Sequence, residues 1–431
     1  MDIIQIKKSI EEWQKILPKA DNYKIIKIIQ EVISLYPKLD EKQKELFLVN
    51  FKPIQKKIFD YIYSNDPFLR KHVVLLASIL NSNELILDVI KYLKIEKDYD
   101  NIMVYLDYID KFKVVGFVEN LFDFTKTPDL PFAIKLKAFY IILVLSTGYK
   151  SYEKFLDFIF EELKNVFIQS KKMYFQLIVN FLNDFLFYTL NFLSNKECPK
   201  NLSVYSPNIL SIFSNFYNTL FFRLIDFVKF IVQKSEEDEK VVNIISKAFL
   251  LLFVIYCVLK ENKYFENQNL QENNEENIYD KINLMNFLKE IIDKEKKLIT
   301  VLLFILNDIE ECGIKNAFKQ YLMENNNLDE DSSFIGYLLN FLGNEKYSNM
   351  VLQFIDKLDL SLTNSELEKI SEFCKRSTNE NDILLCLNIM DKNSYYEDIF
   401  YFAKYSAGYS EKVKIRIKEL LQKMIESRKD E

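Results

Sequence analysis

Glycine is unusually scarce in this chain, with six in 431 residues where average usage would give roughly 30. Glycine readily takes the left-handed backbone conformations that β-hairpins, phosphate-binding loops and nucleophile elbows require. A long chain with so little glycine therefore favours long helices joined by short polar connections. The sequence also carries no nucleotide-binding loop, nucleophile elbow, zinc-protease motif or calcium loop.

The overall composition indicates a protein with a large core and balanced charge. Apolar residues make up 49% of the chain and aromatic residues 15%, while 57 basic residues face 63 acidic ones for a net charge of −6. Proteins that wrap nucleic acid usually show a strong basic excess. Only five of the basic residues are Arg, the residue best suited to bidentate contacts with phosphate or guanine. We therefore expect no nucleic-acid partner.

Cysteine and histidine usage gives little sign of a disulfide framework or a metal site. The five cysteines are widely spaced, and the closest pair, Cys374 and Cys386, lies 12 residues apart. This pattern predicts a reducing compartment, and we expect a cytoplasmic protein. The N-terminal sequence resembles neither a secretory signal nor an Arg-rich transit peptide. A single His cannot form a His-rich metal site, and His72 lies in an apolar stretch, so we expect a packed or surface-edge side chain rather than a catalytic one.

Apolar residues recur with helical period along most of the chain. In residues 21–36 seven Ile, Val and Leu side chains form one broad stripe with Lys and Glu outside it, and Pro37 ends the pattern. Pro18 likewise ends a first helix expected at 3–17. Proline is tolerated in the first turn of a helix, and four prolines fall where helices are expected to begin: Pro53, Pro67, Pro131 and Pro207. We expect about 18 to 20 helices and no strand.

Three segments, 54–80, 117–147 and 398–425, share one pattern. Each has an apolar helix, a short polar turn and a second helix that opens with an apolar–basic pair. The pairs are Leu69–Arg70, Ile134–Lys135 and Val413–Lys414.

This pattern resembles the HEAT and armadillo-type repeats, in which Asp and often Pro stand in the turn and a basic residue follows near the start of the second helix. The motif residues are Asp66, Pro67 and Arg70, then Asp129, Pro131 and Lys135, then Ser410 and Lys414. Between the first two matches the spacing leaves room for one further helix pair, at 83–94 and 99–110. The resemblance implies an all-α superhelical solenoid of stacked antiparallel helix pairs, used as a binding scaffold. It also implies that the Asp and basic residues act as helix caps and inter-repeat ladders.

One segment departs from the helical pattern. Residues 263–278 hold eleven Asn, Gln or Glu in sixteen positions, too few apolar groups to offset the entropy of ordering. We therefore expect a disordered polar and acidic linker or loop at 263–278. It would separate an N-terminal solenoid with long apolar central helices, 1–262, from a C-terminal α-helical repeat region, 279–431.

The charge of the chain is uneven around this linker. Residues 236–345 contain 21 acidic and 11 basic residues, a local charge of −10. If this region lines a groove, a basic segment of a partner protein is the expected ligand, because complementary potentials favour such an encounter. Charge reversal across 236–239 and 308–311 would then weaken binding.

The middle of the chain is strongly apolar. Residues 173–195 contain one charge and residues 201–222 none, and each is long enough to span a bilayer; the charge-free stretch 248–259 is shorter. Several Asn and Ser residues interrupt the two longer stretches, and such groups are expensive in hydrocarbon. Buried solenoid helices are therefore the favoured interpretation. The alternative is a membrane-associated helical protein that docks or inserts through 173–259.

The sequence thus favours a non-enzymatic scaffold or adaptor that binds other proteins. It nominates no catalytic, cofactor-binding or metal-binding residue. Besides membrane association, two further hypotheses stay open: a helical enzyme or enzyme subunit with a buried carboxylate site, and a solenoid that binds nucleic acid through a basic concave face.

Overall fold

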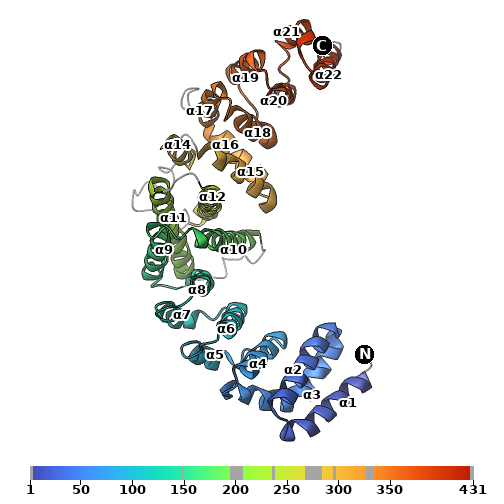
Figure 1. Ribbon diagram of the computed structural model, residues 1–431, viewed down its shortest axis with the longest axis vertical. Helices are drawn as coiled ribbons and strands as arrows, with labels where there is room; N and C mark the ends of the chain where they lie inside the picture. The colour runs from blue at the N-terminus through green and yellow to red at the C-terminus, as the bar shows by residue number, and fades with distance from the viewer. Residues whose placement is uncertain are drawn as a thin grey trace. The chain divides into compact units, whose positions relative to one another are not determined.

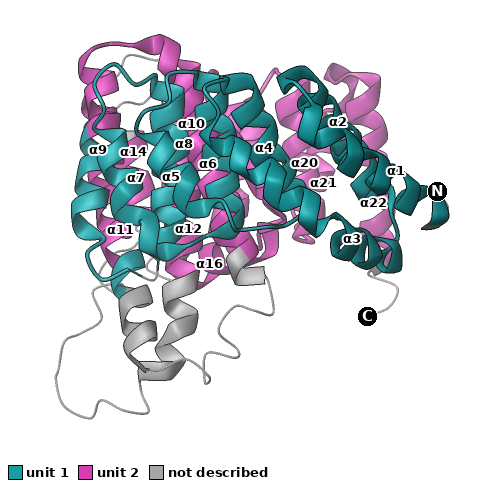
Figure 2. Ribbon diagram, turned by 90° about the horizontal axis from the view of Figure 1, so that it is seen from below, with its two compact units in different colours: residues 1–161, 204–217 teal, residues 162–203, 218–431 magenta. Residues whose placement is uncertain are grey.

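The computed structural model describes residues 3–147, 149–194, 207–234, 238–266, 284–294, 298–326 and 333–427. In these residues the backbone forms 21 α-helices and several short 3-10 helices, and it contains no strand (Figure 1). The predicted all-α fold class is confirmed. The chain divides into two compact units, which we call unit 1 (Met1–Glu161 with Val204–Tyr217) and unit 2 (Glu162–Ser203 with Asn218–Glu431) (Figure 2).

Unit 1 is built on a row of alternate helices. Its helices are α1 Ile3–Ile16, α2 Asn22–Leu35, α3 Glu41–Phe59, α4 Pro67–Ile79, α5 Ile86–Leu93, α6 Tyr99–Phe112, α7 Val118–Thr125 and α8 Phe132–Ser146. Helices α2, α4, α6 and α8 pack each against the next. Beside this row, α1 packs on α3, α5 on α6, and α7 on α8. The core of unit 1 therefore lies between successive helices of the row and the helices packed beside them.

Unit 2 also contains a row of packed helices. Its helices include α10 Phe175–Ser194, α12 Glu239–Glu266, α14 Leu284–Lys294, α15 Val301–Cys312, α16 Lys315–Asn326, α17 Phe334–Leu339, α18 Ser348–Leu358, α19 Asn364–Arg376, α20 Glu380–Lys392, α21 Ile399–Lys404 and α22 Glu411–Ser427. The row runs through α10, α12, α15, α18, α20 and α22, each in contact with the next. Its members do not alternate regularly along the chain, because α16 and α17 both lie between α15 and α18. Helix α19 packs on α20 and α21 on α22. Two further helices, α9 Glu153–Ile168 and α11 Pro207–Lys234, contribute residues to both units.

Short 3-10 helices lie at many of the connections. They are η1 Leu17–Lys19, η2 Tyr36–Lys38, η3 Asp60–Tyr63, η4 Val115–Phe117, η5 Lys172–Tyr174, η7 Leu298–Thr300, η8 Asn340–Gly343 and η9 Ser406–Gly408. Such tight turns are common at helix ends, where they satisfy carbonyl groups that the α-helix leaves unpaired.

Most helix predictions that the described residues cover are confirmed. Helix α1 stops just before Pro18, α2 occupies the predicted stripe, and α5 and α6 fill the predicted intervening pair. Pro53 was expected to begin a helix, and this prediction is wrong, because Pro53 lies inside α3. The buried neighbours Phe51 and Ile54 hold that helix together across the missing backbone donor. The predicted linker 263–278 lies mostly outside the described residues, with α12 ending at Glu266.

The single Trp of the chain fills the space between α1 and α3. Trp13 is 6% exposed and meets Phe47 and Phe51 edge-on, at centroid distances of 6.5 and 6.2 Å. Its indole N–H donates to Glu31 at 3.0 Å. A buried indole with a satisfied N–H is a packing residue.

Left-handed backbone is more common than the glycine shortage suggests. Seven described residues have positive φ, and glycine holds only one of them, Gly313. The other six are Asn81, Lys113, Asp129, Ser170, Asp359 and Ser394. Most of these follow the last turn of a helix, where the left-handed conformation closes the helix. Short polar side chains tolerate it better than others, because they can hydrogen-bond to the local backbone.

Candidate functional site

The starts of α2, α4 and α6 share one local chemistry. Each is preceded by an aspartate that accepts a hydrogen bond from a backbone N–H of the first turn: Asp21 at 2.9 Å, Asp66 at 3.0 Å and Asp98 at 3.0 Å. An N-cap of this kind satisfies a donor that the helix leaves unpaired, and its charge favours the positive end of the helix dipole. The predicted capping role of Asp66 is confirmed.

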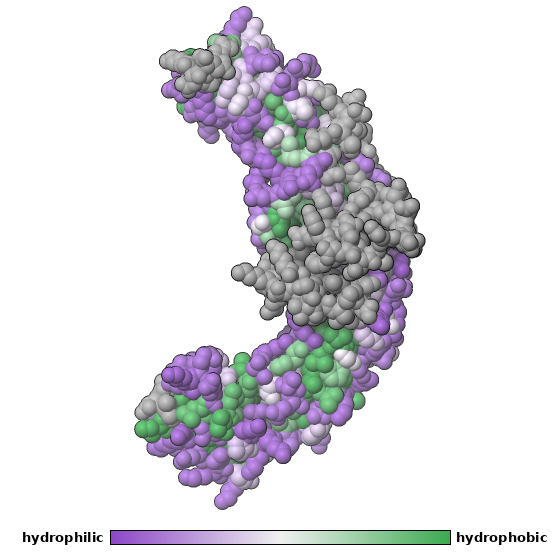
Figure 3. Space-filling model, turned by 180° about the vertical axis from the view of Figure 1, so that it is seen from behind, coloured by the Kyte–Doolittle hydropathy of each residue, from purple (hydrophilic) through white to green (hydrophobic). Residues whose placement is uncertain are grey.

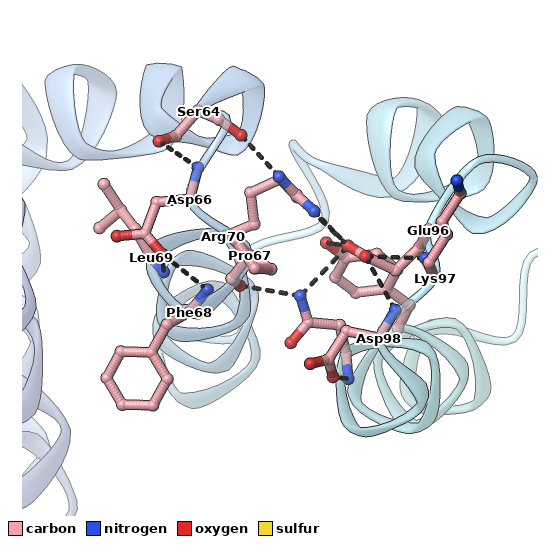
Figure 4. A network of polar contacts seen from close by, with 11 residues as sticks. Ser64, Asp66, Pro67, Phe68, Leu69, Arg70, Glu96, Lys97 and Asp98 are labelled. Carbon is pink, nitrogen blue, oxygen red and sulfur yellow. Dashed lines mark hydrogen bonds and ion pairs between the residues drawn. The ribbon is translucent and has the colours of Figure 1, made fainter.

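A buried network joins α4 to the start of α6 (Figure 4). The Arg70 guanidinium donates to Glu96 Oε2 at 2.6 and 3.2 Å and to the Ser64 carbonyl at 2.7 Å. Glu96 Oε2 also accepts from the Asn101 amide at 3.1 Å and the Tyr105 hydroxyl at 3.3 Å. Burial opposes ionisation of Glu96, but the bonds from Arg70 and Asn101 outweigh it and lower the pKa of this carboxyl. Arg70 therefore links α4 to the segment that leads into α6.

Two further bonds hold the three helix starts side by side. The Asn22 amide donates to Asp66 Oδ2 at 3.2 Å, which joins α2 to α4. The Asn101 amide donates to the Pro67 carbonyl at 2.8 Å, which joins α4 to α6. Because each bond crosses between helices, the three starts form one continuous edge of unit 1.

This edge exposes aromatic side chains. Tyr23 is 77% exposed, Phe68 53% and Tyr99 54%, and each lies one or two residues after its capping aspartate. In Figure 4 the Phe68 ring points away from the polar network. We call residues 21–23, 66–68 and 98–100 the aromatic edge. These nine residues comprise three aromatics, four aspartates, an asparagine and a proline, with no Lys or Arg.

His72 supports the aromatic edge from behind. Its ring is 8% exposed and lies 4.4 Å from the Phe68 ring, centroid to centroid. Nδ1 lies 2.8 Å from the Phe68 carbonyl oxygen and Nε2 lies 3.1 Å from the Gln30 amide nitrogen. The sequence prediction of a packed histidine is confirmed, and the packing fixes the turn of α4 that carries Phe68.

The other predicted motif residues behave less uniformly. Asp129 was expected to cap α8, but it has a φ of 59° and the residue at the N-cap position is Pro131. The turn needs a left-handed residue before the proline, and Asp129 fills that role instead. Ser410 does cap α22, accepting from a backbone N–H at 3.4 Å. Lys414 pairs with Glu411 of its own helix at 2.8 Å.

The row of unit 2 is cross-linked by charges that the sequence did not single out. Asp382 of α20 accepts from Ser348 of α18 at 3.0 Å. Asp391 of α20 pairs with Arg416 and Lys423 of α22, both at 2.7 Å. Burial raises the pKa of Asp391, but the bonds from Lys423 and Arg416 bring it below the usual value. These carboxylates are engaged within the fold, so they hold the row together and leave little charge for a ligand.

Within the acidic region 236–345, Lys247 and Asp308 form a buried charge pair. Asp308 of α15 accepts from Lys247 of α12 at 2.8 Å and from Ser246 at 3.1 Å, and both charged side chains are under 10% exposed. Asp308 therefore cannot present its charge to a partner. Its neighbours Glu310 and Glu311 are exposed, as expected for a solvated helix surface.

The same pair bears on the membrane alternative. One described helix is long and apolar enough to cross a bilayer, the stretch Glu239–Cys257 of α12, and 78% of its most apolar window is buried inside the protein. Lys247 lies within this stretch, where hydrocarbon would leave its charge unpaired. Its pairing with Asp308 fits a helix buried among other helices.

Two features of the described residues bear on the enzyme hypothesis. In these residues no three His, Cys, Asp or Glu side chains gather closely enough to hold a metal ion. A cavity of about 640 Å³ opens beside α19 and the start of α20. Its charged residues are Lys369, Arg376, Glu345, Glu372 and Asp382, so both signs mix and no single substrate charge is favoured.

No protein-family model matches the chain, and no curated protein matches its sequence. Of the surfaces described, the aromatic edge alone combines exposed rings, a repeated position and one sign of charge. The sequence carried a local signal for it, an aspartate followed within two residues by an aromatic, but not its assembly from three distant segments.

Proposed function

We propose that the chain is a non-enzymatic scaffold or adaptor of HEAT/armadillo-like solenoid type, and that the aromatic edge is part of its protein-binding surface. The row of alternate helices in unit 1 supports the solenoid, since stacked helix pairs place every second helix against the next. Cross-links at a regular sequence spacing support it too. Asn101 bonds to Pro67 across 34 residues, and Asn349 bonds to Asp382 across 33.

The observation that carries the binding role is the exposure of the three aromatic rings. Tyr23, Phe68 and Tyr99 leave most or half of their surface in water, each in the first turn of one of three neighbouring helices. Large aromatic side chains contribute strongly to interfaces when a partner covers them. The core of unit 1 does not need the exposed parts of these rings, so their recurrence favours a partner. On the face shown in Figure 3, apolar surface of unit 1 gathers in patches bordered by polar surface.

A matched pair of variants tests this function. The edge variant combines Tyr23→Ser, Phe68→Ser and Tyr99→Ser, and the control combines Val49→Ser and Leu87→Ser, which are 73% and 59% exposed on α3 and α5 of the same unit. Each protein is recovered with its partners from the soluble fraction of native cells, and the partners are quantified by mass spectrometry.

We expect the wild type and the control to retain the same stoichiometric partner, and the edge variant to lose it at least tenfold with unchanged far-UV circular dichroism. Equal recovery by all three proteins would refute the role of the edge.

The four cysteines in the described residues are free thiols, which supports a reducing, cytoplasmic location.

Membrane association through 173–259 is the second candidate, and the apolar stretch of α12 is the observation in its favour. It predicts recovery in the membrane pellet after a salt wash and release only by detergent. Recovery in the soluble fraction without detergent would exclude stable insertion.

A further inference from the structure

We propose that the aromatic edge binds an extended protein segment with Lys or Arg at about every third residue. This inference rests on the proposed function, because it names the partner chemistry of the same surface. It follows from the charge of the edge, the identity of its rings and the spacing of its helices.

The charge of the edge favours a cation. Each helix start places a carboxylate next to an exposed ring, and Asp21, Asp98 and Asp100 are themselves exposed. The face of an aromatic ring attracts a cation, and an adjacent carboxylate adds to the attraction. A Lys or Arg side chain laid across a helix start would therefore meet both groups at once.

Basic residues of the chain itself do not cancel this preference. Arg70 is consumed by Glu96 in the buried network. Lys71 lies 3.5 Å from Asp100, whose side chain is 84% exposed and can accept from a second cation. With the flanking Lys24, Lys71 and Lys97 counted, the edge keeps one negative charge in excess, to which the ring faces add.

The spacing of the helices selects an extended segment. Packed helices lie about 8–10 Å apart, axis to axis. An extended chain rises about 3.3 Å per residue, so roughly three residues span the distance from one helix start to the next. Successive basic residues at every third position would then face the carboxylate and ring of one helix start after another. These pairs are Asp21 with Tyr23, Asp66 with Phe68, and Asp98 with Tyr99. A helical segment, rising about 1.5 Å per residue, would need roughly six.

Labelled synthetic peptides and the full chain test this proposal by fluorescence anisotropy. The first peptide has Lys at every third of twelve positions, between Ser and Ala residues. The second has the same composition with its lysines adjacent, and the third has Gln in place of Lys. We expect the first peptide to bind at least tenfold more tightly than the second at physiological ionic strength, and the third not to bind.

Two charge variants locate the binding. Asp21→Asn, Asp98→Asn and Asp100→Asn together remove three charges, and the first two substitutions keep the caps, because Asn caps helices as well as Asp does. Asp66 is left unchanged because it holds Asn22. Asp40→Asn is the control, since Asp40 caps α3 in the same unit away from the edge. We expect the triple variant to weaken binding at least tenfold and the control to leave it unchanged.

Four results would overturn the proposal. Equal binding of the first two peptides would mean that net charge alone acts. Unchanged binding by the triple variant would place the site elsewhere. Self-association that the Tyr23→Ser, Phe68→Ser and Tyr99→Ser variant abolishes would assign the edge to a second copy of the chain. Loss of the native partner by that variant, with no peptide binding, would refute only the basic segment and leave the scaffold function standing.

Discussion

Arg70→Met removes the cation from the network that joins α4 to α6. Arg70 donates three hydrogen bonds there, and its side chain is 11% exposed while that of Glu96 is 4% exposed. Methionine keeps much of the apolar stem and leaves the carboxylate buried without its counter-ion. Removing one partner of a buried ion pair costs about 3–5 kcal/mol. Two backbone N–H groups and the Asn101 amide still bond to Glu96, so we expect the lower end, about 3 kcal/mol.

Hydrogen exchange of the α4 and α6 amides is the appropriate assay. A chain of two compact units does not guarantee a single two-state transition, whereas exchange reports local opening. A loss of about 3 kcal/mol corresponds to protection lowered about 100-fold, since each 1.4 kcal/mol is a factor of ten. The control is Arg376→Met, whose bond to Glu372 joins side chains that are 80% and 64% exposed, and there protection should change less than twofold. Equal, small effects in both variants would refute the buried network as a stabilising link.

The same network predicts a pH dependence. Because the pKa of Glu96 is lowered in the folded state, its contribution is fully present above the usual carboxyl pKa of 4.5. It is lost as the pH falls from there through the folded-state value. Wild-type protection of α4 should therefore fall toward that of Arg70→Met in acid. A gap between the two proteins that stays constant across this range would contradict the assignment.

Three further outcomes follow from individual positions. Ser170→Gly should raise the free energy of unfolding by about 1 kcal/mol, because glycine takes a φ of 50° without strain. Gly313→Ala should lower it by a similar amount. Calorimetry that shows the opposite signs would refute the backbone argument. Lys247→Met should destabilise unit 2 by about 3–5 kcal/mol, because it leaves Asp308 buried without its counter-ion. Adding Asp308→Leu should restore stability. A urea titration in which the double variant is no more stable than the single one would contradict the buried pair. Burial raises the pKa of Cys312 to about 11. Iodoacetamide at pH 7 should therefore label Cys312 slowly in the native protein and rapidly in urea. Equal labelling rates, measured by mass spectrometry, would count against that burial.

Local features of the fold were predictable because they depend on neighbouring residues. The apolar stripe of 21–36 predicted α2. Asp66 and Pro67 predicted the start of α4, since a cap and a first-turn proline act within one turn. The prediction from Pro53 was wrong because α3 continues past this proline, with buried residues packed on both sides of it. The glycine shortage misled in part, because polar residues close helices in the left-handed conformation at a modest cost.

The candidate site was less predictable, because it depends on which helices become neighbours. Tyr23, Phe68 and Tyr99 are 45 and 31 residues apart, and nothing local indicates that their helices pack in one row. Tyrosine can also fill gaps between helices, as the buried Tyr105 and Tyr108 do, so the residue type alone does not mark these rings as exposed. Exposure is a tertiary property, and only the packing of the row reveals it.

Site-specific photo-crosslinking tests the central claim most directly. A benzophenone side chain is placed at Tyr23, at Tyr99 or at the control position Val49, and the full chain is irradiated in native cells. The account predicts crosslinks to one common partner protein from Tyr23 and Tyr99 and none from Val49. Crosslinks of equal yield from all three positions, or none from the aromatic edge, would contradict it.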